Sequence, residues 1–461
     1  MSQMHYTGHP FIDVGVATIT AMSRKQAPTE VVDEDLERVA TQLKDFYSTL
    51  KPLRNHISSI FLNSWFVQPS KSEADRQQYA DEVLFAFRAD RPLLDQTRCS
   101  FFVEKPAVTY IHRQHLPLLN GEGISNFSAI GQAGIPVSGV ALLAIHAMPL
   151  GCIKAGYLLA FHQLQPATGQ EHDMTLQLAH LNYQKNLAAI QQMRQDESVE
   201  MPNLGGYKRT RYVEALLQVQ QQAKRRRVNA LSHITGYYFT NYGPKPFLEL
   251  VRLDNNITEF VNTVEQDAAD AWRQVVWQGW QLEKGENHQT LAADITSVRR
   301  NTIYEQLFDL PRTTRALLRR LAGARDWNLL TIFLRKVMQM EQERINTYRQ
   351  LGDRLAEYMI KYEGTSMGFY YELFRAKDYT HFRRVLRRAA ERVLKAGEPD
   401  PLFTYNQFIA AFEQPSQGYK NWKIGRDLIS FRVLEMLHER GIDLSQLEEE
   451  KEIPPDESDD E

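Results

Sequence analysis

The chain has 461 residues, of which 43% are hydrophobic and 24% charged, so its length allows two or three domains with sizeable cores. It holds no run of about eighteen apolar residues and no cationic leader before an apolar core, which predicts a protein that is neither secreted nor inserted in a membrane. The two cysteines, Cys99 and Cys152, exclude a disulfide framework and favour a reducing, cytoplasmic setting.

Charge is distributed unevenly along the chain. The formal net charge is −3, but the segment 448–461 holds nine acids and one lysine, so the rest of the chain carries +5. Between residues 299 and 395, 21 lysines and arginines stand against 11 acids. This asymmetry favours a polyanionic partner, and solvated helix faces are the alternative explanation for any single cluster.

The first part of the chain is predicted to mix helices with short strands. A turn followed by an apolar segment opens it over 7–17. Helices are expected from spaced apolar residues over 33–50, 74–88, 171–193, 207–222 and 257–280. Strand character is expected over 99–111, 156–164 and 233–242. The aromatic side chains of 233–242 are expected in a sheet core, with base stacking as the alternative.

The stretch 126–156 is the most distinctive part of the chain. Glycines at 131 and 134 precede Pro136, in a loop that permits close backbone approaches. The apolar run from Val137 to Leu150 is too short and too interrupted to cross a bilayer, and it predicts a buried helix.

Beyond a polar break at 284–288, the pattern is helical throughout. Helices are expected over 289–308, 313–321, 327–362, 379–395, 402–412 and 422–440. The segment 327–362 is predicted to be one long helix with a bundle stripe. The predicted organisation is an α+β domain over 1–283, a helical bundle over 289–445 and an acidic disordered tail over 446–461.

Signals for catalysis are weak. A surface loop explains the HxxH spacing of His112 and His115 better than a metal site does. The dipeptide His172-Asp173 occurs in HD-type phosphohydrolases, but here it opens a predicted helix, where Asp173 would serve as the N-cap. No Walker loop, GxSxG or HExxH motif occurs, so we expect no catalytic residue, no metal and no cofactor.

Basic clusters support nucleic-acid binding better, because Lys and Arg neutralise phosphates. One set brackets the helix predicted after 206. It comprises Lys208, Arg209, Arg211, Lys224, Arg225, Arg226 and Arg227. Four arginines share an arc of the helix 379–395, where like charges repel unless an anion or Glu391 relieves them; they are Arg383, Arg384, Arg387 and Arg388. Further pairs are Arg299, Arg300, Arg319 and Arg320.

The loop before the apolar helix is a second type of candidate. Short hydrogen-bonding side chains lie on its glycine-rich backbone, and such side chains can read base edges or hold phosphates. They are Ser125, Asn126, Ser128 and Gln132. On chemistry alone, a tight structural loop explains them equally well.

The same stretch resembles the large subunit of subtype I-B CRISPR interference complexes, the CXXC–CXXC type. The match is carried by Asn126, Phe127, Gly131, Gly134, Pro136, Pro149, Leu150 and Gly151, and by Asp13 and Gly15 in the opening TGHPFIDVGVA. The informative motifs lie within 1–165. Of the two cysteine pairs that give this type its name, only Cys99 remains, and Ser138 and Ala141 stand where the second pair is expected.

The resemblance implies a degenerate zinc-ribbon-like insert over about 95–155 that binds no metal. Its backbone would be held by the packing of Leu142, Leu143, Ile145 and Met148. Loss of the cysteines suggests a divergent branch, such as the CRISPR-associated transposon systems. The bundle over 289–445 would resemble the small subunit of the complex, Cascade.

By this resemblance, the protein is a non-catalytic subunit that recognises the protospacer-adjacent motif, assists duplex opening and R-loop stabilisation, and recruits an effector. Motif contact is expected from the loop 123–134 and Lys154. The implied partners are guide RNA, target double-stranded DNA, the backbone and 5′-handle-binding subunits, the small subunit, and an effector nuclease-helicase or transposition adaptor. The alternatives are a metal-dependent phosphohydrolase or nuclease using His172-Asp173, and a helical scaffold without nucleic-acid contact.

Overall fold

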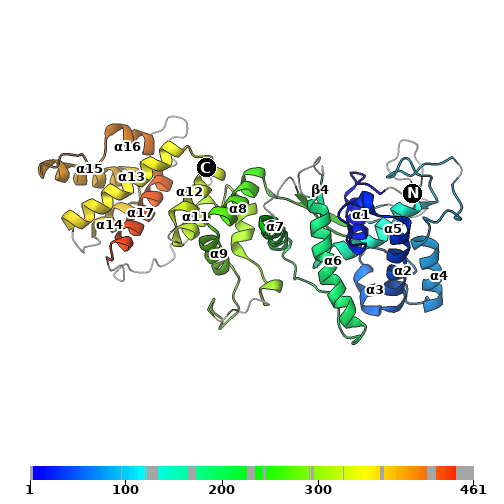
Figure 1. Cartoon of the computed structure of the whole chain (residues 1–461). Coiled ribbons are helices and arrows are strands. Elements are labelled where there is room, and N and C mark those ends of the chain that lie inside the picture. The colour runs from blue at the N-terminus through cyan, green and yellow to red at the C-terminus, as the bar shows by residue number, and fades with distance from the viewer. Residues whose placement is uncertain are drawn as a thin grey trace. The chain divides into compact units, whose positions relative to one another are not determined.

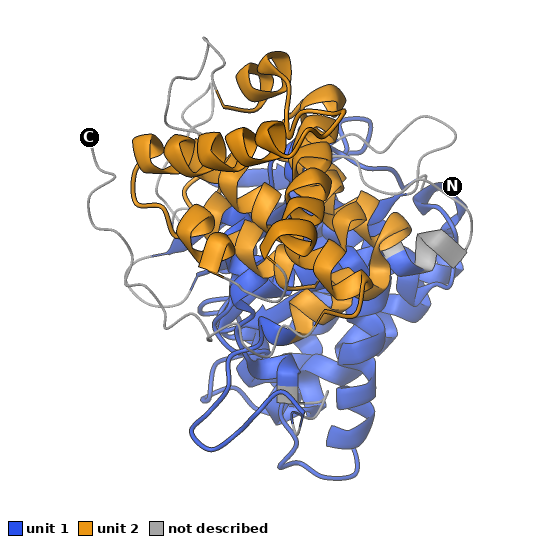
Figure 2. Cartoon of the chain, turned by 90° about the vertical axis from the view of Figure 1, so that its left-hand side faces the viewer, with its two compact units in different colours: residues 1–258, 278–308 blue, residues 259–277, 309–461 orange. Residues whose placement is uncertain are grey.

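The computed structural model divides the chain into two compact units, 1–258 with 278–308 and 259–277 with 309–461 (Figure 2). It describes residues 4–94, 96–119, 121, 133–164, 173–225, 234–241, 246–289, 291, 295–324, 326–363, 368–412 and 422–442. Helices dominate both units, and the small sheets are antiparallel. The predicted α+β class with a helical C-terminal region is therefore confirmed.

The first unit is built around a buried helix, α1 (Pro10–Met22), which packs on α5 (Gly139–Ala147) and α6 (Met174–Met193) (Figure 1). Every residue from Phe11 to Met22 is buried, so α1 has no solvent face. The sequence pattern predicts only a turn and an apolar segment at 7–17. Other helices of this unit are α2 (Asp33–Thr49), α3 (Lys51–Ile57), α4 (Glu73–Leu84), α7 (Lys208–Arg225) and α10 (Thr302–Phe308).

The main sheet of the first unit has four strands in the order β3-β4-β5-β6. They are β3 (Ile153–Ala155), β4 (Tyr157–Gln163), β5 (Ile234–Thr240) and β6 (Phe247–Val251). Phe239 is fully buried, and the hydroxyl of Tyr238 donates to the carbonyl of Ala155 at 2.9 Å. These contacts place both of these aromatic side chains of β5 in the sheet core, as predicted. The segment 99–111 forms only a short strand, β1 (Thr109–Ile111), which pairs with β2 (Ile135–Val137).

The apolar run after β2 forms α5 and a 3-10 turn, η2 (Met148–Gly151), and all of it is buried. Ser138 is the N-cap of α5, because its hydroxyl accepts from the backbone N–H of Ala141 at 3.4 Å. The two positions expected to replace a cysteine pair therefore begin a core helix. Leu142, Leu143, Ile145 and Met148 are buried as predicted, within α5 and η2.

The polar break predicted at 284–288 lies inside the first unit. Backbone bonds explain this, since Gln281 donates to the carbonyl of Arg300 at 2.9 Å and Thr302 donates to Gly279 at 2.7 Å. Residues 278–308 are thus tied together as a hairpin-like segment, which includes η3 (Ile295–Val298). The second unit starts after this segment and also includes 259–277.

The second unit is helical throughout its described part. It contains most of α8 (Asn255–Asp267) and α9 (Ala269–Gln278), followed by α11 (Thr314–Gly323), α12 (Trp327–Lys336), α13 (Gln342–Tyr358), η4 (Met359–Glu363), α14 (Gly368–Phe374), α15 (Tyr379–Lys395), α16 (Tyr405–Phe412) and α17 (Trp422–Glu439). Within it α13 packs along α17, and α16 covers both (Figure 1).

The prediction of one long helix over 327–362 is wrong. The segment breaks into α12 and α13, and Gln339 between them has a φ of +52°. A residue in this left-handed region cannot continue an α-helix, and the apolar spacing on both sides hides the break.

Replacing Gln339 with glycine is expected to stabilise the second unit by about 0.5 to 1 kcal/mol, because glycine adopts positive φ without steric cost. Gln350→Gly, in the interior of α13, should instead destabilise it by about 1 kcal/mol. Urea unfolding of the two full-length variants measures both changes. A decrease in stability in Gln339→Gly would contradict the assignment of this break.

Candidate nucleic-acid interface

The helix α15 presents one apolar and one basic face. Its buried residues recur at helical spacing and are Phe382, Val385, Leu386, Ala389 and Val393. The arginines of the predicted arc all lie on the opposite, exposed face. Asp378 begins the helix by accepting from the backbone N–H of His381 at 2.7 Å. The sequence prediction of a basic arc on a packed helix is therefore confirmed.

The four arginines of the arc have different partners. Arg388 forms an ion pair with Glu372 of α14, and Arg387 lies 3.4 Å from Glu391 with its side chain 75% exposed. Arg383 lies over the rings of Tyr379 and Phe408. Within the described residues, Arg384 has no ion-pair partner. Internal acids thus relieve part of the repulsion, and Arg384 and Arg387 remain the most available for a phosphate.

A second basic surface lies at the start of α7. A pocket of about 240 Å³ is lined by Gly206, Tyr207, Lys208, Arg209, Glu249, Arg300 and Glu305. Lys208 pairs with Glu249, and Arg300 lies 3.9 Å from Glu305. Glu305 also accepts from the backbone N–H and the hydroxyl of Thr210, at 3.2 and 2.9 Å. The carboxylate of Glu305 therefore lies at the N-terminus of α7, where an external anion such as a phosphate would otherwise bind.

Two predicted contact residues have structural roles instead. Arg211 is 2% exposed, pairs with Glu214 at 2.5 Å and donates to the carbonyls of Thr296 and Arg299. Arg299 is 10% exposed and pairs with Glu286 and Glu283. Both arginines bind groups within the first unit and link residues 295–300 to it. We therefore no longer count them among the residues that could contact nucleic acid. Sequence spacing alone does not distinguish them from surface arginines.

The remaining predicted residues fall into two groups. Lys154 is half-buried in β3, and Arg319 and Arg320 are exposed on α11, with no ion-pair partner within the described residues for any of the three. Ser125, Asn126, Ser128, Gln132, Arg226 and Arg227 lie outside the described residues. Lys224 and Arg225 end α7, and the structure describes only their backbone.

Of the dipeptide His172-Asp173, the structure describes only Asp173. Asp173 is the N-cap of α6, accepting from the backbone N–H of Leu176 at 2.8 Å, and its other oxygen accepts from the hydroxyl of Tyr6. Burial raises the pKa of Asp173. The cap role predicted for Asp173 is confirmed, while His172 lies outside the described residues. In the part of the chain that the structure describes, no group of three His, Cys, Asp or Glu could hold a metal ion.

Asp13 is the centre of a buried polar network that sequence reasoning missed. Its carboxylate accepts from the backbone N–H groups of Thr7 and Gly8, at 2.6 and 2.9 Å, and from the hydroxyl of Thr7 at 2.8 Å. His162 Nε2 of β4 lies 3.0 Å from the same carboxylate. Asp13 therefore holds the turn before α1 and fastens it to the sheet, which gives the motif at 7–17 a structural reason.

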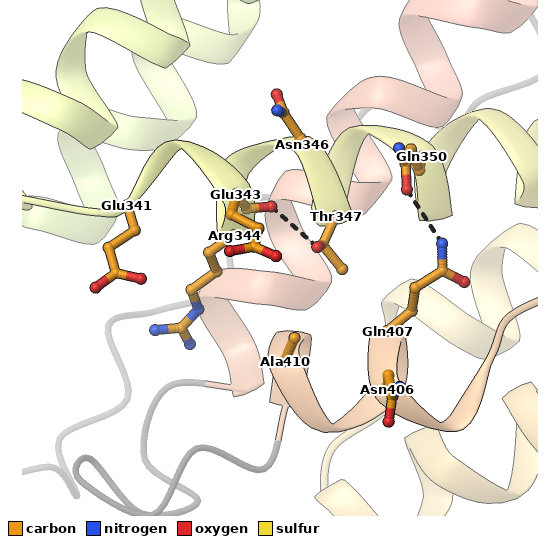
Figure 3. A pocket seen from close by; sticks show the side chains of 9 residues that line it. All are labelled: Glu341, Glu343, Arg344, Asn346, Thr347, Gln350, Asn406, Gln407 and Ala410. Carbon is orange, nitrogen blue, oxygen red and sulfur yellow. Dashed lines mark hydrogen bonds between the residues drawn. The ribbon is translucent and has the colours of Figure 1, made fainter.

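The second unit has a polar groove between α13 and α16 with a volume of about 430 Å³ (Figure 3). Asn346, Thr347 and Gln350 line one side, and Asn406 and Gln407 line the other. Gln407 donates to Gln350 across the groove at 3.1 Å. One end has two carboxylates and one guanidinium, from Glu341, Glu343 and Arg344. This net negative lining is unsuited to a phosphate. The groove forms only when α13 meets α16, so no local motif predicts it.

Comparison with known proteins adds no relative. No protein-family model, no curated protein and no solved structure matches the chain. Among the described helices, none has both the length and the apolar composition that a bilayer-spanning helix requires.

Proposed function

We propose that this protein is a non-catalytic, nucleic-acid-binding subunit of an RNA-guided DNA-targeting complex, as its resemblance to the I-B large subunit implies. It would recognise the protospacer-adjacent motif, hold the opened strands and recruit a nuclease-helicase or a transposition adaptor, in the cytoplasm. The single observation that carries the binding role is the exposed arginine face of α15. A surface that holds the opened DNA strands needs positive charge but need not read bases, because the guide RNA reads the sequence by base pairing.

The charge distribution of the second unit supports the same role. Exposed arginines without an ion pair among the described residues also occur on α11 and α12, and they are Arg319, Arg320 and Arg335. Several cations on one unit would contact several phosphates at once, and each contact releases counterions. A scaffold without nucleic-acid contact offers no comparable reason for so many uncompensated arginines on one unit.

The enzyme alternative gains no support from the geometry of Asp173. Both of its carboxylate oxygens already accept hydrogen bonds within the fold, one at the start of α6 and one from Tyr6. These bonds give Asp173 a structural role, and within the described residues no group of three His, Cys, Asp or Glu could hold a metal ion. We therefore keep the binding role as the one proposed function.

Neutralising Arg384 and Arg387 together, as Arg384→Gln with Arg387→Gln, is expected to weaken binding of target DNA by the assembled guide complex. The slope of log K against log salt concentration should decrease in magnitude by about 0.7 to 0.9 for each phosphate that the variant no longer neutralises. Filter binding or anisotropy over a salt series measures this slope.

The matched control is Arg273→Gln on α9, whose side chain is 65% exposed and paired with Asp270. It removes a charge from the same unit away from the arc, and we expect an unchanged slope. An unchanged slope in the double variant as well would rule out phosphate contact by α15.

A further inference from the structure

The helix α15 carries a dense cluster of positive charge on its exposed face. The helix α15 has 17 residues and carries five arginines and one lysine against a single acid, Glu391. It is about 25 Å long. Its exposed face also includes Leu394, whose 78% exposure is unusual for a leucine. This face needs a partner that is anionic and tolerates one aliphatic contact.

The last described helix, α17, ends close to one end of α15. After α17, Arg440 lies 3.7 Å from Glu357 near the end of α13. Just beyond α13, Glu363 forms an ion pair with Arg392 of α15 at 2.5 Å, and the carbonyl of Tyr362 accepts from the same arginine at 2.9 Å. The end of α17 and the C-terminal half of α15 therefore contact the same end of α13, within one unit.

Residues 443–461 follow the last described residue, Ile442, and number 19. Fully extended, they would reach about 65 Å, more than twice the length of α15. From 448 onward they carry nine acids and one lysine, so their net charge of −8 opposes that of the basic face. Length, starting point and charge all suit this segment to α15.

We propose that the acidic segment 443–461 docks on the basic face of α15 of the same chain and competes there with the nucleic-acid backbone. The docking stands on charge and chain path alone, whereas the competition rests on the proposed function. Carboxylates of the segment would relieve the repulsion among Arg384, Arg387 and Arg388. Because the segment is tethered, its effective concentration reaches the millimolar range, so that weak ion pairs suffice.

Docking is tested by zero-length cross-linking of the full-length protein with a carbodiimide. The reagent joins a lysine amine to a carboxylate in contact with it as an amide, and the water released converts the carbodiimide to a urea. The probe is Lys395, the exposed last residue of α15. We expect cross-links from Lys395 to acids of 448–461 in the monomer band, and their disappearance in Arg384→Glu with Arg387→Glu.

Two outcomes would overturn the docking. One is the absence of cross-links between Lys395 and the acidic segment at low salt. The other is their restriction to the dimer band, which would mean that the segment binds a second copy. Neither outcome depends on nucleic acid, so the docking can fail while the proposed function stands.

Competition is tested with full-length protein in which all nine acids of 448–461 are replaced by the corresponding amides. If the segment occupies the face nine-tenths of the time, single-stranded DNA should bind about tenfold more tightly when it is released. The gain should disappear in the Arg384→Glu, Arg387→Glu background and at high salt. An equal affinity of neutralised and native protein at low salt would refute competition, and the absence of any DNA binding by both would refute the proposed function.

Discussion

Three histidines buried without charge in the first unit are expected to contribute about 6 kcal/mol of destabilisation when the pH is lowered from 7.5 to 5. They are His56, His115 and His146, which are 3%, 7% and 0% exposed. Burial lowers the pKa of His56 and of His115 to about 3 and that of His146 to about 4. Histidine in the unfolded chain titrates near 6.5, so each one binds a proton only after unfolding.

The direction follows from this difference in bound protons. Between pH 6.5 and 4 the unfolded state binds more protons than the folded state, so stability is lost as the pH falls through this window. Each histidine contributes about 1.4 kcal/mol per pH unit, or about 2 kcal/mol at pH 5. His146 stacks on Phe61 with ring centroids 4.9 Å apart, and both ring nitrogens of His56 are buried without a hydrogen-bond partner in the structure. Neither site can readily solvate an imidazolium.

Urea unfolding of the full chain at several pH values measures the slope of the free energy of unfolding against pH. His56→Leu should reduce this slope by about 1.4 kcal/mol per pH unit between pH 5 and 6, whatever it does to the stability at pH 8. His438→Gln is the control, because His438 is exposed on α17. A slope that is the same in the native protein and in His56→Leu would show that His56 is protonated in the folded state.

The burial of His115 cannot be predicted from its local sequence. His115 was predicted to lie in a surface loop, yet it is buried, and its Nδ1 accepts from the backbone N–H of His112 at 3.4 Å. The HxxH spacing is short enough to form a turn that folds inward, and nothing in the local sequence distinguishes this from an exposed loop. Burial at this position depends on residues far away in the chain.

The sequence predicts those helices and strands that are specified by neighbouring residues, through apolar spacing and helix caps. Helices α2, α6 and α15 and strands β4 and β5 fall close to their predicted positions, because apolar spacing and caps such as Asp173 and Asp378 specify them directly. The four-residue arc of α15 was found for the same reason. It requires only that a helix form there and that Phe382 and Val385 face inward.

Tertiary contacts decided the elements that were missed. Helix α1 is buried on all sides, so it shows no amphipathic period by which to identify a helix. Arg211 and Arg299 look like surface cations in the sequence, but Arg211 is buried and Arg299 is paired with Glu286 within the segment 278–308. The break at Gln339 and the groove between α13 and α16 arise from packing within the second unit. Such features need the three-dimensional neighbours to be known.

Replacing Gly15 with alanine is expected to destabilise the first unit by at least about 3 kcal/mol, although alanine is the better helix former. A Cβ at this position in α1 would lie 2.0 Å from the carbonyl oxygen of Ala144 in α5. The obstacle is backbone, so only a shift of one core helix against the other can relieve it. Both helices are buried along their length, so a shift of one against the other would open cavities in the core.

The sign of the change in the free energy of unfolding distinguishes two effects. Close contact between α1 and α5 predicts that Gly15→Ala destabilises the protein, whereas helix propensity alone predicts that it stabilises it. Gly323→Ala, at the end of α11, meets no atom within 4 Å and should leave stability unchanged or raise it by up to about 1 kcal/mol. Gly206→Ala is an equally open control in the first unit. Denaturant midpoints at constant m-value measure all three substitutions. If Gly15→Ala is as stable as the native protein, α1 and α5 do not cross at this distance, and Gly15 in the opening motif has no packing role.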